Sequence, residues 1–305
     1  MLAGADLGVI RSGPIGNCTY YFTEQLPMTL LTLDQVFLSV EKNVALAGFL
    51  QNSQVRCDLF TLGGVPRWVV EYLSELKKCS RLDKNVINQC FVNVWTKYVE
   101  SYISSISTQQ LVRLAAFAVS GRQVQQRDKF DVHFKWSKLR DSSLCLLNPS
   151  GRYGVCDVQV PYALLRSIGL RRNAMATDAE KSFATALMDT RDLVDKTLFD
   201  LDPWQSWGMF RACFYAVRIN ALLVLGHSTV TLGELLPGAQ MSDKTRDISV
   251  ELAPSRVFWC AEEFGPSTPQ LVSGQDKPLE KVDWTSSGCI AVGGDEGVDV
   301  DIFSL

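Results

Sequence analysis

Two small groups of residues have the types and spacing that chemistry requires. In the first, Arg67 follows a turn that contains Gly63, Gly64 and Pro66. The paired glycines allow a sharp turn, and proline suits the first position of a helix. Arg67 is then expected on the first helical turn, where its guanidinium can reach a phosphate bound to another domain. The alternative is an ordinary surface arginine.

The second group consists of four carboxylates near residue 300, namely Asp295, Glu296, Asp299 and Asp301. Asp299 and Asp301 are two positions apart, so on a strand both side chains point to the same face. Clustered carboxylates of this kind can hold a hard divalent ion, although the spacing does not match the twelve-residue calcium loop. The alternative is a solvated acidic loop.

A local basic patch is the third feature. Residues 113–141 contain seven Lys or Arg residues and three Asp residues, whereas the whole chain has a net charge of −3. Any contact with nucleic acid is therefore expected to be local, through Lys135, Lys138 and Arg140 on phosphates. The alternative is a solvated loop beside a structural domain.

Several common catalytic classes are excluded by the absence of their motifs. The sequence has no phosphate-binding Gly-x-x-x-x-Gly-Lys-Ser/Thr loop, no Gly-x-Ser-x-Gly and no Gly-x-Gly-x-x-Gly before a helix. His133 and His227 cannot supply a zinc-ligand pattern. The nine cysteines contain no Cys-x-x-Cys pair and are interpreted as reduced, buried thiols. We therefore expect no cofactor for this chain alone and no activity of its own.

The first hundred residues predict a helical region. Thr32 and Gln35 form a capping-box pattern that opens one helix, and a second helix is expected from Pro66 through Leu76. Apolar residues at three- and four-residue steps predict a third helix over 84–104. Its predicted buried stripe consists of Val86, Ile87, Cys90, Phe91, Val94, Trp95, Tyr98 and Tyr102.

The central region predicts a winged helix. Two helices, Leu111–Val119 and Trp136–Asp141, precede two strand-like runs, Leu144–Leu147 and Val155–Val160, which are separated by residues of hairpin-loop type. A long helical region, 161–226, is expected to follow. The fold class predicted for the whole chain is therefore mainly α with small β elements.

The last third of the chain predicts a linker and two strands. Gly265–Pro278 has the composition of a linker or long loop, and Gly288–Val292 and Val298–Phe303 are strand-like. The N-terminus has no basic segment of a secretory signal, and no apolar run approaches the length of a membrane span. No membrane association is therefore expected.

The order of these pieces resembles the crinkler-type effectors of oomycetes and some other eukaryotes. In that family an AAA/STAND ATPase is followed by helical and winged-helix-like regions and a restriction-endonuclease-like domain. The matching segments are Leu30–Val36, Leu62–Arg67, Trp136–Leu144, Val160–Leu165, Phe210–Leu222 and Thr231–Ala239. The resemblance covers most of the chain.

The resemblance implies roles for the first two groups. Arg67 matches the lid arginine that senses nucleotide phosphates, with Gly63, Gly64 and Pro66 shaping its turn. Asp301 matches an acid of the nuclease, where it would help to bind a metal ion, and Asp299 is a second candidate ligand only by its spacing. The ATPase's phosphate loop and the nuclease's acid-x-Lys strand are missing, as is the translocation segment. The chain is therefore expected to be a fragment, a truncated gene model or a degenerate paralogue.

The implied organisation has four segments. Residues 1–104 are similar to the C-terminal part of the ATPase with its helical lid, 105–170 to the winged-helix region, 171–264 to the pre-nuclease helices and 265–305 to a truncated nuclease start. A full-length relative would use ATP and magnesium, and would be secreted and act in the host cell or nucleus. The winged-helix-like region would contact a host protein or DNA. Two alternatives stay open: a non-catalytic winged-helix interaction or DNA-binding protein, and the regulatory part of a STAND-type ATPase.

Overall fold

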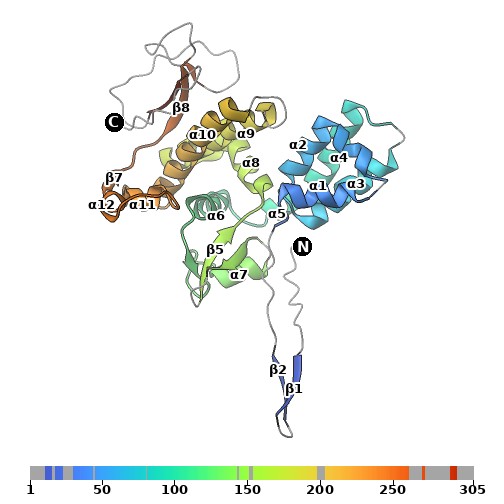
Figure 1. The fold of residues 1–305 in the computed structure, drawn as a ribbon, viewed down its shortest axis with the longest axis horizontal. Helices are drawn as coiled ribbons and strands as arrows, with labels where there is room; N and C mark the ends of the chain where they lie inside the picture. Colours follow the sequence, from blue (N-terminus) through green and yellow to red (C-terminus); the bar gives the residue numbers. More distant parts are fainter. Residues whose placement is uncertain are drawn as a thin grey trace. The chain divides into compact units, whose positions relative to one another are not determined.

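The computed structural model is mainly helical with small sheets, as the sequence predicts (Figure 1). It describes residues 11–15, 18–22, 30–43, 45–79, 81–142, 144–150, 154–197, 203–260, 270–271 and 289–293. The chain forms two compact units, residues 1–98 with 121–161, and residues 99–120 with 162–305. The four segments predicted from the sequence stay a prediction.

The first unit begins with a hairpin and continues into short helices. Strands β1 (Arg11–Ile15) and β2 (Cys18–Phe22) pair antiparallel. The helices are α1 (Leu33–Glu41), a 3₁₀ turn (Ala47–Gln51), α2 (Ser53–Thr61), α3 (Pro66–Lys78) and α4 (Lys84–Val94). The predicted capping box is confirmed, because Thr32 accepts from the Gln35 amide at 3.2 Å and Gln35 accepts from the Thr32 amide at 2.9 Å.

The core of these helices is a set of apolar stripes. Helix α3 buries Trp68, Val69, Tyr72, Leu73 and Leu76, at the spacing of one helical face. Helix α4 buries Ile87, Cys90 and Val94 and packs against α3. This hydrophobic packing, rather than helix propensity, is what stabilises helices of this length.

The predicted stripe over 84–104 is wrong in its last two turns. Residues Trp95–Glu100 form a π-helical segment, in which hydrogen bonds span five residues rather than four. The wider turn moves the buried positions to Val99 and Ile103. Tyr98 is left half-buried, with part of its side chain at the surface.

Residues 121–161 add a small sheet and one helix to the first unit. The strands β3 (Val124–Gln125), β4 (Leu146–Pro149) and β5 (Val155–Gln159) are arranged in the order β3-β5-β4, all antiparallel. Helix α7 spans Trp136–Asp141, the same residues as predicted. The predicted hairpin is confirmed, whereas β3 was not predicted, and the winged-helix assignment stays a prediction.

The second unit is built around a long helix pair. Helices α9 (Asp178–Thr197) and α10 (Pro203–Val224) pack along each other, and α6 (Thr108–Ser120) and α8 (Tyr162–Leu170) cover them (Figure 1). The short helices are α5 (Ser101–Ile103), a 3₁₀ turn (Arg172–Ala174), α11 (Leu232–Leu235) and α12 (Asp243–Arg246).

Two small sheets complete the second unit. Strands β6 (Thr229–Thr231) and β7 (Ser249–Glu251) pair antiparallel. Strand β8 (Arg256–Cys260) lies between β9 (Gln270–Leu271), which is antiparallel to it, and β10 (Cys289–Gly293), which is parallel. The predicted strand over 288–292 is confirmed as β10, and β9 lies within the predicted linker. The predicted strand Val298–Phe303 lies outside the described residues.

Candidate functional site

The turn before Arg67 depends on two glycines in the left-handed conformation. Gly63 has φ 67° and Gly64 has φ 69°, values that residues with a Cβ rarely adopt. The Gly64 carbonyl accepts a 3.0 Å hydrogen bond from the Leu31 amide. A Cβ on Gly64 would overlap the Leu31 carbonyl oxygen. The turn therefore binds the segment before α1 to the start of α3.

Arg67 lies on the first turn of α3, as predicted, and its side chain is exposed. Val65 is the N-cap, without a capping side chain, and Pro66 occupies the first turn. The Arg67 guanidinium lies 5.2 Å from the centre of the Tyr98 ring, and the Lys97 ammonium lies 5.0 Å from the same centre. We call Arg67, Lys97 and Tyr98 the Tyr98 cluster.

The Tyr98 cluster carries two positive charges, and the carboxylates of Glu71 and Glu75 also act on Lys97. The hydrogen bond to Tyr98, followed by the charge interaction with it, raises the pKa of Lys97, so the ammonium stays protonated at neutral pH. Among the described residues, neither Arg67 nor Lys97 forms a salt bridge. The positive end of the α3 dipole adds to the same field. The cluster can therefore contact an anion, although one arginine and one lysine do not enclose it.

A buried polar contact holds α3 in place behind this surface. The Tyr72 hydroxyl donates to Asp58 Oδ2 at 2.6 Å, and Gln54 Nε2 donates to Asp58 Oδ1 at 2.9 Å. Burial, followed by the charge of Asp58, raises the pKa of Tyr72, which keeps its proton. The contact joins α2 to α3 and is structural. We did not predict it from the sequence, although an aspartate on an otherwise apolar helix face was a usable signal.

The predicted basic group is only partly available for binding. Lys135 and Lys138 are exposed, and Lys138 lies 4.9 Å from the centre of the Phe134 ring. Arg140 instead binds its neighbour Asp141, through Nε at 3.0 Å and Nη2 at 2.8 Å. Its charge is therefore largely neutralised within the chain.

Lys129 is a member of this surface that sequence reasoning missed. It pairs with Lys135 across an isolated antiparallel bridge, so the two side chains are on the same face. Like charges placed opposite each other repel, and a bound anion would relieve that repulsion. We call Lys129, Lys135 and Lys138 the lysine surface.

The loop that carries the lysine surface has a rigid base. The Phe130 amide donates to the Phe134 carbonyl at 2.9 Å, and Phe130 packs edge-on against Trp136 with ring centres 4.9 Å apart. Asp131 Oδ1 accepts from the amides of His133 and Phe134, both at 2.7 Å. The two lysines of the bridge are therefore fixed in position by backbone contacts and buried rings.

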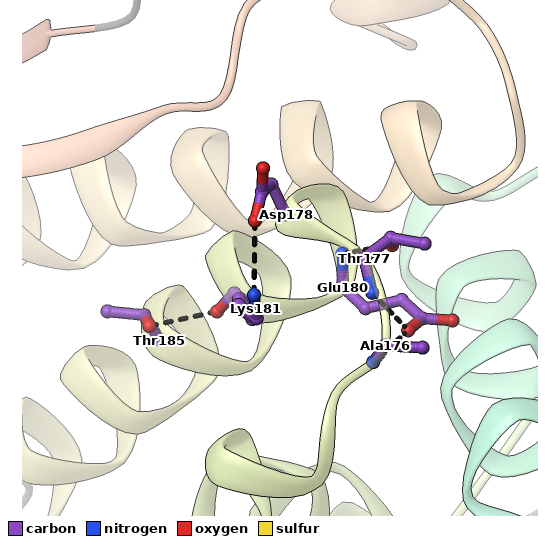
Figure 2. Close-up of polar contacts among 6 residues, drawn as sticks. All are labelled: Ala176, Thr177, Asp178, Glu180, Lys181 and Thr185. Atoms are coloured by element: carbon purple, nitrogen blue, oxygen red, sulfur yellow. Dashed lines mark hydrogen bonds and ion pairs between the residues drawn. The ribbon is translucent and has the colours of Figure 1, made fainter.

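The predicted metal-binding carboxylates, Asp299 and Asp301, lie outside the described residues. Across the part of the chain that the structure describes, no three His, Cys, Asp or Glu side chains form a metal-binding group. The carboxylates at the start of α9 are already engaged (Figure 2). There Glu180 accepts from the Ala176 amide at 2.8 Å and the Thr177 amide at 3.1 Å, and Asp178 pairs with Lys181 at 3.2 Å.

Comparison with known proteins supplies no relative. Neither a protein-family model, nor a curated protein, nor a solved structure matches this chain. Within the described residues, no helix is both long enough and apolar enough to cross a membrane.

Proposed function

We propose that this chain is a crinkler-like effector in which α3 presents Arg67 to the phosphates of a nucleotide held elsewhere. The observation that carries the proposal is the exposed Arg67 guanidinium, 5.2 Å from the centre of the Tyr98 ring on the first turn of α3. The ring limits the freedom of the side chain and leaves its donors available to solvent. The resemblance of Leu30–Val36 and Leu62–Arg67 to the family's lid supports the same role.

The proposed role is sensing rather than binding. Most phosphate affinity in such ATPases comes from a glycine-rich loop and its lysine, and this sequence contains no such motif. Arg67 adds one charge-assisted contact, worth about 1.5–3 kcal/mol. ATP and magnesium would therefore be bound mainly by other groups, and secretion into a host cell would follow from the same resemblance.

The test is to map which residues of this protein are contacted by inorganic tripolyphosphate. Inorganic tripolyphosphate is titrated into isotopically labelled protein, and amide and arginine side-chain shifts are followed by NMR. We expect the largest shifts at Arg67 and the amides next to it, with their loss in Arg67→Ala. Arg56→Ala is the matched control, because Arg56 is also held over an aromatic ring, 5.5 Å from Phe37. Shifts spread evenly over surface lysines would contradict the proposal.

The second candidate function is contact with nucleic acid through the lysine surface. It is favoured by Lys129 and Lys135, whose side chains face the same way across the bridge. Because the net charge is −3, we expect weak binding of duplex DNA that falls steeply with salt.

A salt titration of duplex binding distinguishes binding by the lysine surface from non-specific binding by other charges of the protein. Replacing Lys129 and Lys135 with Gln removes two phosphate contacts, which should reduce the slope of log K against log salt by about 2. Arg140→Gln is the control and should change the slope little, because Asp141 already binds Arg140. Equal effects of both variants, or tight binding at high salt, would reject the lysine surface.

A further inference from the structure

We propose that Cys79 and Cys90 form an oxidisable thiol pair that a hydroperoxide converts to a disulfide. Their sulfur atoms lie 3.7 Å apart. Cys79 is the residue that ends α3, and Cys90 is in the middle of α4. The two sulfurs need to approach by less than about 2 Å to form a bond. The modification is independent of the proposed role of Arg67.

The two thiols differ in accessibility, which sets the order of reaction. Cys79 is half-exposed, and its Sγ lies 3.4 Å from the Glu75 carbonyl oxygen. Cys90 is 5% exposed, and its pKa is raised to about 11, first by burial and then by the hydrogen bond to Cys79. The oxidant therefore meets Cys79 first, and Cys90 is the resolving thiol.

The chemistry is balanced in two steps. The Cys79 thiolate attacks one oxygen of the hydroperoxide, the O–O bond breaks, and the products are a sulfenic acid and water or an alcohol. The Cys90 sulfur then attacks the Cys79 sulfur, the S–O bond breaks, and the hydroxyl leaves with a proton as water. The chain loses two hydrogens, and the hydroperoxide takes up two electrons.

The backbone around Cys79 and Cys90 permits the small movement that disulfide formation needs. Cys79 has an extended conformation, φ −86° and ψ 134°, so it does not continue α3, and α4 begins at Lys84. A shift of Cys79 therefore does not break α3 hydrogen bonds along its length. The bond would join the end of α3 farthest from Arg67 to α4, and would stabilise this helix pair by limiting the unfolded chain.

The experiment exposes the reduced full chain to hydrogen peroxide after removal of the reductant. We expect an intact mass lower by two hydrogens, a peptide that links Cys79 to Cys90, and a higher Tm that dithiothreitol reverses. Cys79→Ser should abolish the linked peptide, whereas Cys57→Ser, which changes another half-exposed thiol, should retain it.

Two outcomes would overturn the inference. One is oxidation of Cys79 to a sulfinic acid with no linked peptide. The other is a linkage that pairs Cys79 with a different cysteine. Because Cys79 is half-exposed, Cys79→Ser is expected to fold, and a circular dichroism spectrum like that of the parent confirms that loss of the link is not loss of structure.

Discussion

The Leu31 amide donates a 3.0 Å hydrogen bond to the carbonyl oxygen of Gly64, across more than thirty residues of chain. This bond places the capping residue of α1, Thr32, next to the turn that starts α3. The direction in which α3 presents Arg67 therefore depends on a backbone contact that only glycine allows.

Replacement of Gly64 with Ala should destabilise the protein by about 2–5 kcal/mol, from a left-handed conformation and a steric overlap together. Gly226→Ala is the control, because Gly226 has φ 84° and no atom within 4 Å of an added Cβ. It should lose only about 1–2 kcal/mol. The measurement is urea unfolding of both variants, and equal losses would show that Leu31 does not constrain the turn.

Replacement of Tyr72 with Phe should cost about 1–3 kcal/mol of unfolding free energy, because buried Asp58 loses its 2.6 Å donor. Tyr215→Phe is the control. Tyr215 is half-buried, and within the described part of the chain no hydrogen bond is found for its hydroxyl. A Tyr72→Phe variant as stable as the parent would mean that Asp58 does not need the Tyr72 hydroxyl as a donor.

Stability should decrease as the pH rises above about 9. Burial raises the pKa of Cys145 to about 12, and burial followed by the charge of Asp189 raises the pKa of Cys213 to about 12, from an ordinary value of 9.0. Below pH 9 both thiols are protonated in the folded and unfolded states. Between pH 9 and 12 the unfolded chain releases these protons and the folded chain does not, so unfolding becomes easier.

The expected slope is about 1.4 kcal/mol per pH unit for each such thiol. Urea unfolding under reducing conditions at several pH values measures it. In Cys213→Ala the unfolding free energy should fall less steeply with pH above pH 9. Well below pH 9, the difference in unfolding free energy between variant and parent should not change with pH. An unchanged slope would show that Cys213 ionises normally in the folded protein.

The sequence predicts what is decided locally. The Thr32 capping box and the bounds of α7 were correct, because hydrogen bonds within one turn and apolar spacing determine them. The π-helical segment Trp95–Glu100 was not predicted, since one wider turn leaves no signal in a periodic pattern. Its effect is to leave Tyr98 half-buried beside Arg67.

The candidate site was predicted only in its parts. Arg67 and its glycines were identified, whereas Tyr98 and Lys97 were not associated with them, because that contact depends on how α3 packs against the segment after α4. The pairing of Arg140 with Asp141 was available from the sequence, since the two are neighbours. The pairing of Lys129 with Lys135 could not be predicted, because it depends on the register of the loop between them. The contact between Cys79 and Cys90 could not be predicted either, because it depends on how α3 and α4 are aligned.

The affinity of the full chain for inorganic tripolyphosphate, measured for the parent, Arg67→Ala and Arg56→Ala, tests the central claim most directly. The parent should bind weakly, with a Kd on the order of 1 mM or weaker, since a charge-assisted contact contributes about 1.5–3 kcal/mol. Arg67→Ala should lower the affinity about tenfold or more, and Arg56→Ala should leave it unchanged. Equal affinities for Arg67→Ala and the parent, or micromolar binding that survives Arg67→Ala, would contradict a phosphate-sensing role for Arg67.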